Sequence, residues 1–564
     1  MELSSIERIM NERRQKALKL KELGFNPYVN GYTPSIDNKS FIEKYDKFSK
    51  EELLEVQDSF SIAGRVMSVR SMGKAAFIIV KDASASLQVF LQKEHLSEND
   101  FAAFKLLDMG DFVFASGKPM KTKTGELSLN IDNFKILTKT LRPLPEKWHG
   151  LTNVEERYRH REVDLIVNDK AAWIFRTRSK IIRYLQNFLD QRGFIEVETP
   201  VLTDIAGGAE AKPFLTHHNA LSEDLCMRIA TEIPLKRLIV GGMEKVYEIG
   251  RMFRNEGVST KHNPEFTSIE FYQAYATYEN FIELTQEFFK GLVKHIHGTD
   301  KLEYQGHILD FSKPFRKVPI AQLVAEHLGF DEKKTKELIG ITSVKEALNI
   351  THKKLVSEEE AVVLCLKDLN VEEMNSILPE FLEEPAHSHM DLISVAKKIV
   401  KTKDFSDVLV MGEKIDKALS SERRRSLALN LLYGVFDHQV EQHIIQPTFI
   451  TDFCVSNSPL ARKRDGDEAV VDRFELIIAK MEVANAFSEL NDADDQRERF
   501  VRQAQMKFMG EEEACEVDEA FLHSLEVGMP PAAGQGIGID RLVMLLTNSA
   551  SIREVILFPK MKRK

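Results

Sequence analysis

The stretch EKVYEIGRMFRNEGVSTKHNPEFTSIEFYQAYATY, Glu244 to Tyr278, decides the fold. It predicts two strands joined by a polar loop, because polar and apolar residues alternate along its second half. Phe266, Glu270 and Tyr272 would share one face of that strand with Ser268. The loop holds a dense set of charged and hydrogen-bonding groups: Arg251, Arg254, Glu256, Lys261, His262 and Asn263. Two interpretations stay open here, a pocket lined by the polar face and an ordinary hairpin with a solvated charged loop.

The composition bounds the class of protein. A length of 564 residues predicts roughly three to four domains. The content of 43% hydrophobic and 29% charged residues is typical of a soluble globular protein. A net charge of −10 counts only weakly against a nucleic-acid binder, since local patches decide such binding.

The chain shows no sign of a membrane or secreted protein. No apolar run approaches the roughly 20 residues that a membrane span needs. The first residues place apolar side chains at helical spacing among charges, unlike a signal peptide. The four cysteines, Cys226, Cys365, Cys454 and Cys515, are far apart, which argues against a disulfide framework and a cysteine-based zinc site. We therefore expect a cytoplasmic protein without membrane attachment.

Changes in periodicity predict the domain organisation of an α+β protein. Residues 1–57 form an N-terminal helical segment, and residues 58–140 are short strands with Gly and Asp turns, which suit a small barrel of the OB type. Residues 141–168 are rich in charge and contain two prolines, as in a linker. Residues 169–564 mix helices and strands, with a helical insertion at about 330–425.

The barrel offers a candidate surface for nucleic acid. OB barrels often bind single strands by aromatic stacking within a basic surround. Phe77, with Arg70 and Lys74, would serve. A structural barrel with Phe77 in its core is an equally valid interpretation at this point.

A second segment, residues 473–490, places carboxylates where a packed sheet should have apolar side chains. If Ala479-Lys480 forms a two-residue turn, Ile477 pairs with Glu482, and Glu475 shares their face. Two carboxylates on one face without a nearby base would repel each other, so they suggest a divalent cation, Mg²⁺.

The same strand continues with Asn485, Phe487 and Glu489 alternating on one face. Glu482 and Asn485 differ by three positions, so a regular strand would put them on opposite faces. If both line one site, a bulge must fall between them.

The Gly-rich run GQGIGIDRLVMLL, residues 534–546, is not a dinucleotide fingerprint and lacks the lysine of a phosphate-binding loop. Gly534, Gly536 and Gly538 would allow close approach of the backbone, with Arg541 just inside the following helix. A packed strand-to-helix turn explains the run equally well.

Three motifs together carry a family resemblance. They are the F-R-x-E of residues 253–256, the HNPEFT-x-x-E-x-Y of residues 262–272 and the G-x-G-I-G-I-D-R of residues 534–541. In this order they resemble the class II aminoacyl-tRNA synthetases and, within subclass b, the bacterial-type lysyl-tRNA synthetases. The E-V-E-T-P of Glu196–Pro200 resembles the dimer-forming motif of that family, and the N-terminal helix and barrel resemble its anticodon-binding domain.

The resemblance implies an OB-fold barrel followed by an antiparallel-sheet catalytic domain, in a homodimer. It covers nearly the whole chain except about 330–425. The implied enzyme activates L-lysine with ATP, releases pyrophosphate and transfers the lysyl group to the 3′ end of tRNA(Lys), with Mg²⁺ as cofactor.

The resemblance also implies a role for each matching residue. The catalytic residues are Arg254 and Arg541. The ATP-binding residues are Arg254, Glu256, His262, Asn263, Phe266 and Arg541. The residues for substrate lysine are Gly208, Glu232, Glu270, Tyr272, Asn485, Phe487 and Glu489. The metal ligands are Glu475 and Glu482, and the anticodon-binding residues are Phe77, Gln88 and Glu126.

The chain departs from the family pattern in the second segment. Ala479-Lys480 stands where the family has Gly-Gly, and Ala484 and Ala486 replace further glycines. A positive φ at any of these positions would cost about a kcal/mol or more without glycine.

Three functions remain to be separated. The first is an active lysyl enzyme, and the second is a catalytically inactive relative that binds RNA. The third is an aspartyl- or asparaginyl-type enzyme of the same architecture. Tyr272 and Glu489 favour lysine, because a buried ammonium needs a carboxylate and hydrogen-bond acceptors, whereas an aspartate-specific pocket would need Arg or Lys.

Overall fold

Two compact units make up the chain, Met1–Asn153 and Val154–Lys564. The computed structural model describes residues 4–145, 153–351, 358–382, 385–386, 392–402, 405–508 and 517–563. Residues 146–152 of the predicted linker, parts of the predicted insertion, and Cys515 lie outside the described residues. The other cysteines, Cys226, Cys365 and Cys454, are buried free thiols.

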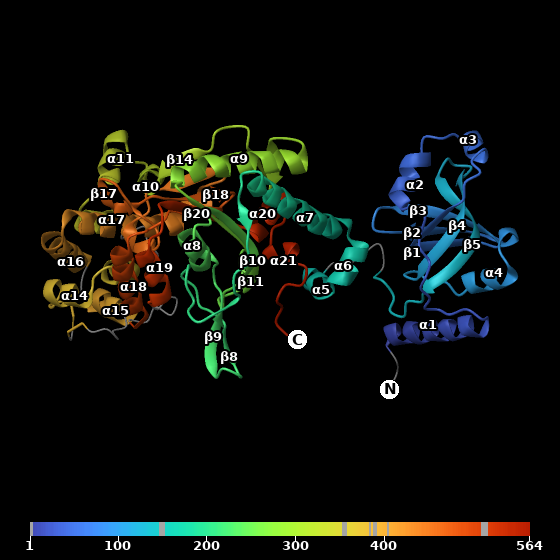
Figure 1. The fold of residues 1–564 in the computed structure, drawn as a ribbon, viewed down its shortest axis with the longest axis horizontal. Helices are drawn as coiled ribbons and strands as arrows, with labels where there is room; N and C mark the ends of the chain where they lie inside the picture. Colours follow the sequence, from blue (N-terminus) through green and yellow to red (C-terminus); the bar gives the residue numbers. More distant parts are fainter. Residues whose placement is uncertain are drawn as a thin grey trace. The chain divides into compact units, whose positions relative to one another are not determined.

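The first unit is a closed five-stranded barrel with helices around it (Figure 1). Its strand order is β1-β2-β3-β5-β4, with a parallel pair only between β3 and β5. The predicted OB barrel is therefore confirmed. The elements are α1 (Ser5–Glu22), α2 (Asn38–Tyr45), α3 (Lys50–Leu54), β1 (Phe60–Met72), β2 (Ala75–Lys81), β3 (Ser86–Gln92), α4 (Glu98–Phe104), β4 (Phe112–Lys121) and β5 (Leu127–Thr138).

The second unit is built on one large sheet. The strand order is β14-β15-β18-β19-β20-β11-β10-β6, antiparallel except for the end pairs β14–β15 and β10–β6. The expected large antiparallel sheet is confirmed. Its strands are β6 (Ile195–Glu196), β10 (Lys245–Phe253), β11 (Glu265–Ala274), β14 (Arg316–Pro319), β15 (Thr448–Thr451), β18 (Arg473–Ile478), β19 (Met481–Ser488) and β20 (Ala532–Gly538).

Apolar helices cover one face of this sheet and leave the other face for a site. The covering helices are α7 (Asp169–Asp190), α9 (Tyr278–His297) and α20 (Ile539–Leu546). Their buried side chains share one core with the sheet residues Ile269, Phe271 and Ile537. Alternation along β11 then points Phe266, Ser268, Glu270 and Tyr272 to the opposite face, as the sequence predicted.

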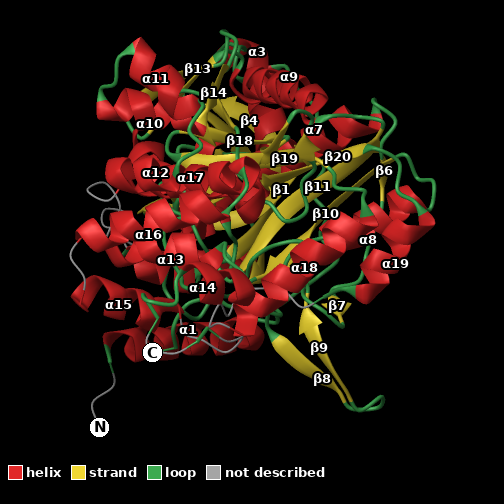
Figure 2. Cartoon of the chain, turned by 90° about the vertical axis from the view of Figure 1, so that its left-hand side faces the viewer, coloured by secondary structure: helices red, strands yellow, loops and turns green. Residues whose placement is uncertain are grey.

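Smaller elements surround the sheet. Strands β8 (Leu215–His218) and β9 (Glu223–Met227) form a hairpin that extends away from the sheet (Figure 2). The remaining elements are β7 (Leu202–Thr203), α8 (Glu232–Val240), β12 (Lys301–Tyr304), β13 (His307–Asp310), β16 (Lys463–Arg464), β17 (Asp467–Val471), α18 (Ala493–Phe508), α19 (Glu519–Val527) and α21 (Ile552–Val555).

The predicted linker at 141–168 is too long at its C-terminal end. Residues after Asn153 form α5 (Val154–Arg159) and α6 (Arg161–Val167) within the second unit. The buried Arg161 side chain donates hydrogen bonds to the carbonyl oxygens of Arg553, Ile556 and Leu557. A charge-rich sequence is typical of a solvated linker. Here, however, a buried charged side chain supplies the hydrogen bonds that backbone carbonyl groups inside the fold would otherwise lack.

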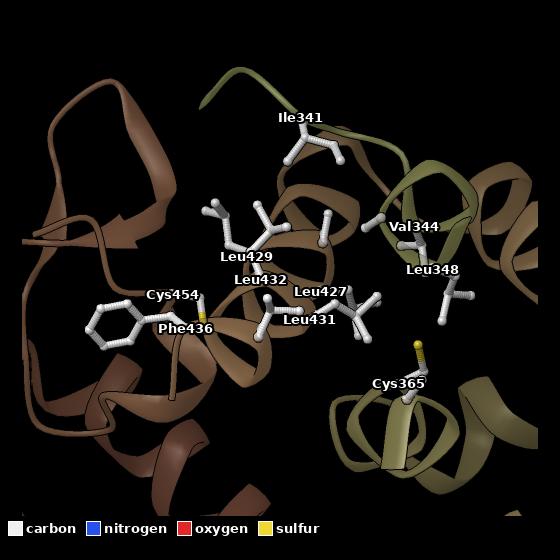
Figure 3. Close-up of a cluster of buried hydrophobic side chains, with 14 of the residues drawn as sticks. Ile341, Val344, Leu348, Cys365, Leu427, Leu429, Leu431, Leu432, Phe436 and Cys454 are labelled. Carbon is white, nitrogen blue, oxygen red and sulfur yellow. The ribbon is translucent and has the colours of Figure 1, made fainter. Parts of the chain in front are cut away.

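The helix-rich segment packs at the β14–β15 end of the sheet, in a core that it shares with Val318, Ile450 and Ile477 of the sheet. Its helices are α10 (Ile320–Leu328), α11 (Glu332–Ile339), α12 (Val344–Thr351), α13 (Glu358–Lys367), α14 (Val371–Ile377), α15 (Leu392–Thr402), α16 (Phe405–Ala418) and α17 (Ser421–Val435). Figure 3 shows Val344, Leu348 and Cys365 facing leucines of α17 in this core. Burial raises the pKa of the Cys365 thiol, so this cysteine packs as an apolar group.

The β18–β19 hairpin has the geometry that the sequence predicted. Ile478 pairs with Met481 across a two-residue turn, and Ile477 pairs with Glu482. The next pair is Leu476 with Ala484, so Val483 is the extra residue of a bulge. This bulge brings Glu482 onto the same face as Asn485.

Both turn residues adopt the left-handed conformation that favours glycine, with φ of 50° at Ala479 and 66° at Lys480. Ala484 and Ala486 do not have a positive φ. Neighbouring groups stabilise the turn, because the Ala479 and Lys480 amides donate to the Ile445 and Ile444 carbonyl oxygens at 2.9 and 2.8 Å. Lys261 Nζ donates to the Lys480 carbonyl oxygen at 2.6 Å.

We predict that Lys480→Gly stabilises the protein. Glycine at this exposed position removes the strain of the left-handed conformation. This gain exceeds the cost of glycine's larger conformational entropy in the unfolded chain by on the order of 0.5–1 kcal/mol. The thermal unfolding midpoint of the second unit, measured by calorimetry, should rise by about 1–2 °C. Lys301→Gly is the matched control, because Lys301 is an exposed strand lysine without a positive φ, and its midpoint should fall. A lower midpoint for Lys480→Gly contradicts the left-handed turn.

Candidate active site

A cavity of about 640 Å³ lies on the open face of the sheet in the second unit. It brings together predicted site residues that are up to 333 positions apart in the sequence, Gly208 and Arg541. The predicted residues that line it are Gly208, Glu232, Arg254, Glu256, His262, Asn263, Phe266, Glu270, Tyr272, Glu482, Asn485, Phe487 and Arg541. The predicted residues Glu475 and Glu489 are not among the lining residues and are buried, at 8% and 1% exposed.

Glycines of β20 make the floor of the cavity. Gly534 lies between Tyr272 of β11 and Phe487 of β19, and Gly536 lies between Glu270 and Asn485. A Cβ atom at Gly534 would fall 2.1 Å from Tyr272 Cε1 and 2.3 Å from Glu489 Oε1. Gly534 therefore lets the side chains of Tyr272 and Glu489 come close together. Any other residue at position 534 would collide with them.

One end of the cavity is cationic. The Arg254 guanidinium lies 5.2 Å from the centroid of the Phe266 ring, and burial lowers its pKa without discharging it. Arg541 Nη1 donates to the Glu482 carbonyl oxygen at 2.7 Å, and Arg541 Nη2 lies 3.1 Å from His262 Nε2. This end is suited to a polyanion beside an aromatic ring.

The imidazole of His262 is neutral. Burial and the charge of Arg541 lower its pKa. Its Nε2 accepts from Arg541, because a guanidinium only donates, so the proton is on Nδ1 and faces Ser259 Oγ at 2.9 Å. The loop thus holds Arg541 from one side while Glu482 holds it from the other. Beside them, Asn263 Oδ1 is a buried acceptor without a partner among the described residues.

A buried ion pair positions Arg541. Asp540, the residue before it, accepts from Arg178 Nη1 of α7 at 2.5 Å and from the Thr267 amide of β11 at 2.7 Å. Arg178 Nη2 also donates to Thr267 Oγ1 at 2.9 Å. The first turn of α20 is therefore fixed to β11, and Arg541 in that turn lines the cavity.

The other end of the cavity is anionic and buried. Glu270 accepts from the Thr231 amide at 3.2 Å and from the Tyr272 hydroxyl at 3.4 Å. Burial, followed by the charge of Glu232, raises the pKa of Glu270 to about 7. An arrangement that raises the pKa of a carboxylate in this way is prepared for a cation.

Two further carboxylates at this end share an internal lysine. Lys236 Nζ of α8 lies 2.5 Å from Glu232 Oε1 and forms an ion pair with Glu489 Oε2. Glu489 Oε1 has no partner among the residues that the structure describes. Burial raises the pKa of both carboxyl groups, and the Lys236 ammonium opposes that rise.

Gly208 packs tightly against this cluster. Its φ is +84°, and a Cβ atom there would fall 2.9 Å from the Cβ of Glu232. The loop that carries it therefore needs glycine both for its backbone conformation and for contact with Glu232.

The predicted metal ligands Glu475 and Glu482 lie on the two strands of the β18–β19 hairpin, where Glu475 pairs with Asn485 and Glu482 pairs with Ile477. Burial, followed by the charge of Glu482, raises the pKa of Glu475 to about 8. Two carboxylates fit Mg²⁺, which takes one or two protein carboxylates together with substrate phosphates. In the described residues, no group of three or more His, Cys, Asp or Glu side chains is arranged to hold a metal ion.

Arg473 stands beside the metal pair and was missed by the sequence analysis. Its Nη2 lies 2.6 Å from Glu475 Oε1, and its Nε donates to Asn485 Oδ1 at 3.2 Å. The sequence analysis also missed Lys236. In PLKRLIVGG, residues 234–242, Lys236 and its neighbour Arg237 both look like solvent-exposed charges on a helix. The spacing Glu232–Lys236, one helical turn, was the available signal.

The barrel of the first unit carries the predicted anticodon residues on its outer surface. Phe77 is half-buried and faces outward, since its neighbours Ala76 and Ile78 fill the core. The structure therefore excludes the core interpretation of Phe77. Phe77 pairs with Phe90, an unpredicted partner, at 4.7 Å between ring centroids. Gln88 Nε2 donates to Ser128 Oγ at 2.8 Å, and Glu126 is exposed.

Comparisons with protein families match both units. The family described as "tRNA synthetases class II (D, K and N)" matches residues 153–562, and "OB-fold nucleic acid binding domain" matches residues 60–137.

Individual relatives match over their full length. The lysine–tRNA ligase of Anaeromyxobacter sp. (strain K) is 45% identical, over 100% of this chain and 99% of the relative. Those of Staphylococcus epidermidis and Oceanobacillus iheyensis are each 42% identical, over 98% of both chains. The family model covers synthetases for three amino acids (D, K and N), whereas these relatives are all named as ligases for lysine. Across the described ranges, no helix has the length and apolar character to span a membrane.

We predict that Glu270→Gln makes the stability of the second unit less sensitive to pH. The pKa of this carboxyl group rises from about 4.5 in the unfolded chain to about 7 in the folded protein. The free energy of unfolding therefore falls as the pH rises through this range. The neutral amide of the variant would remove this loss. The variant should gain roughly 2–3 kcal/mol over the parent between pH 5 and pH 8. The measurement is the thermal midpoint at both pH values, and an equal gap at pH 5 and pH 8 would contradict the raised pKa.

Proposed function

The chain belongs to the lysine–tRNA ligases, which are class II aminoacyl-tRNA synthetases, and from this premise we propose that its cavity binds L-lysine beside Tyr272 and ATP beside Phe266. One observation carries the proposal, the separation of charge along β11. Glu232, Glu270 and Glu489 gather near Tyr272, whereas Arg254 and Arg541 lie at the end that carries Phe266. Phe266 and Tyr272 are six residue steps apart along the strand, about 20 Å, which is enough for the two substrates to meet in the middle.

The anionic end takes the two ammonium groups of lysine. Glu489 and Tyr272 hold the ε-ammonium, because they converge over Gly534 and Glu489 Oε1 has no partner in the described part of the chain. Glu232 and Gly208 hold the α-ammonium. Glu270, Asn485 and Phe487 complete the pocket walls.

The cationic end takes ATP. Phe266 stacks on one face of the adenine ring and Arg541 on the other. Arg254 holds the α-phosphate together with the carboxylate of lysine. Glu256, His262 and Asn263 line the same end and contact the nucleotide.

Glu475 and Glu482 hold Mg²⁺, which supplies positive charge to the phosphates of ATP when bound. The fit rests on the raised pKa of Glu475, because a cation would relieve its repulsion with Glu482. Arg473 keeps Glu475 oriented through its 2.6 Å contact.

In the first reaction, a carboxylate oxygen of lysine attacks the α-phosphorus of ATP, and pyrophosphate leaves. Two anions approach each other, so the barrier falls mainly through positioning and charge. Arg254 holds both reacting groups, and Arg541 offsets charge on the phosphates. No protein nucleophile is required. In the second reaction, a hydroxyl group at the 3′ end of tRNA(Lys) attacks the carbonyl carbon of lysyl-adenylate, and AMP leaves.

The first unit reads the anticodon of that tRNA. Phe77 and Phe90 offer a partly exposed aromatic pair on which a base stacks, with Gln88 and Glu126 as hydrogen-bonding neighbours. The active form is a homodimer that joins through the short edge strand β6 and the segment after it. Support comes from apolar side chains there that are exposed in one chain, Ile195, Val201 and Leu202.

ATP–pyrophosphate exchange with each amino acid in turn tests this function. We predict exchange with lysine and none with aspartate or asparagine, because the anionic end would repel their side chains or leave its carboxylates unpaired. Exchange with aspartate instead of lysine would contradict the pocket. Exchange with no amino acid would favour a protein that only binds RNA.

Glu489→Gln should weaken lysine binding much more than ATP binding. Loss of a charge-assisted contact to a buried ammonium corresponds to about a 10–100-fold rise in the lysine KM of the exchange reaction. The ATP KM should stay within about twofold, since Glu489 lies at the far end of the cavity. Glu303→Gln, an exposed strand position in the same unit, is the control. An equal rise in both KM values would refute the role of Glu489.

A further inference from the structure

Lys236 is a fully buried ammonium in the centre of the acidic end. Its side chain is 0% exposed, and it lies one turn after Glu232 on α8. Two aromatic rings enclose its Nζ, with the centroids of Phe487 and Phe521 at 5.4 and 5.8 Å. Burial alone would lower its pKa, but the charges of Glu232 and Glu489 raise it above the ordinary value. The group therefore remains a cation.

Lys236 engages only part of each carboxylate. It contacts Glu232 Oε1 and Glu489 Oε2. Glu489 Oε1 is left without a partner among the described residues, beside Tyr272 and above Gly534 of the cavity floor. Glu232 itself lines the cavity, whereas Lys236 does not. Lys236 thus contacts Glu232 and Glu489 from outside the cavity lining, and Glu489 Oε1 lies next to Gly534, which lines the cavity.

The charges at this end also balance in a particular way. Glu232, Glu270 and Glu489 supply three carboxylates, and Lys236 supplies one ammonium. When all three carboxyl groups are ionised, as a bound cation favours, two negative charges are left, and L-lysine brings two ammonium groups. Without Lys236, three carboxylates would repel each other in a buried space, and protonation or reorientation would relieve the repulsion.

We propose that Lys236 is a specificity-determining positioning residue, whose ammonium fixes Glu232 and Glu489 so that their remaining oxygens receive the two ammonium groups of substrate lysine. This inference rests on the proposed function of the cavity. It deepens that function, because selection for a diamino acid then depends on an internal cation that never touches the substrate. An amino acid with a neutral side chain would leave one of the two charges unbalanced.

The test is lysine-dependent ATP–pyrophosphate exchange by Lys236→Met and Lys236→Gln in the full chain. Methionine keeps the length and helix propensity of the side chain, and glutamine also keeps hydrogen-bonding capacity, so both remove mainly the charge. We expect the lysine KM to rise by at least about 30-fold and the ATP KM to stay within about twofold. Arg237→Met, the same kind of change on the exposed side of α8, is the control and should leave both values unchanged.

A double-mutant cycle separates positioning from a general structural role. Because Lys236 acts partly through Glu489, adding Lys236→Met to Glu489→Gln should raise the lysine KM at least about threefold less than Lys236→Met does in the parent, and the remaining rise is the part that acts through Glu232. Independent, multiplicative effects would overturn the proposal, as would an unchanged lysine KM in either single variant. If Lys236→Met does not fold, Lys236→Gln and its own double mutant decide the question. Absence of lysine exchange in the unsubstituted protein would instead refute the proposed function.

Discussion

Burial of negative charge on the open face of the sheet is the constraint on which the second unit depends. Glu232, Glu270 and Glu489 lie in an environment where an isolated carboxylate is costly. The neighbouring structure offsets part of this cost. Lys236 pairs with two of the carboxylates, and the Thr231 amide donates to the third. The remaining imbalance favours a cationic ligand.

The same constraint explains features of the backbone that look unrelated to charge. The glycines of β20 leave room for the side chains of β11 and β19 to converge. The bulge at Val483 keeps Glu482 on the face of the cavity, where it meets Arg541. The left-handed turn at Ala479 and Lys480 then closes the hairpin, and contacts from Ile444, Ile445 and Lys261 compensate for its strain.

Much of this architecture follows from sequence patterns that depend only on local chemistry. Alternation along residues 265–274 predicted which side chains of β11 line a pocket. The three-residue spacing of Glu482 and Asn485 predicted the bulge. The barrel followed from strand length and turns, although sequence alone left the orientation of Phe77 open.

Other features depend on tertiary contacts that no local pattern contains. Lys236 and Arg473 look like ordinary cations in the sequence, and only the folded chain pairs them with buried carboxylates. Residues 154–167 read as a charged linker because the carbonyl groups that accept from Arg161 lie about 400 positions later. The contact of Phe90 with Phe77 depends on the register between β2 and β3, which the sequence does not show.

The most direct test of the account is calorimetric titration of L-lysine into the protein at pH 7, in buffers with different ionisation enthalpies. With a pKa of about 7, Glu270 is half protonated in the free protein, and a bound ammonium would ionise it. Lysine binding should release up to about half a proton per lysine bound from Glu270, and norleucine, which lacks the ε-ammonium, should show no measurable binding. Lysine binding without proton release, or equal binding of norleucine, would contradict it.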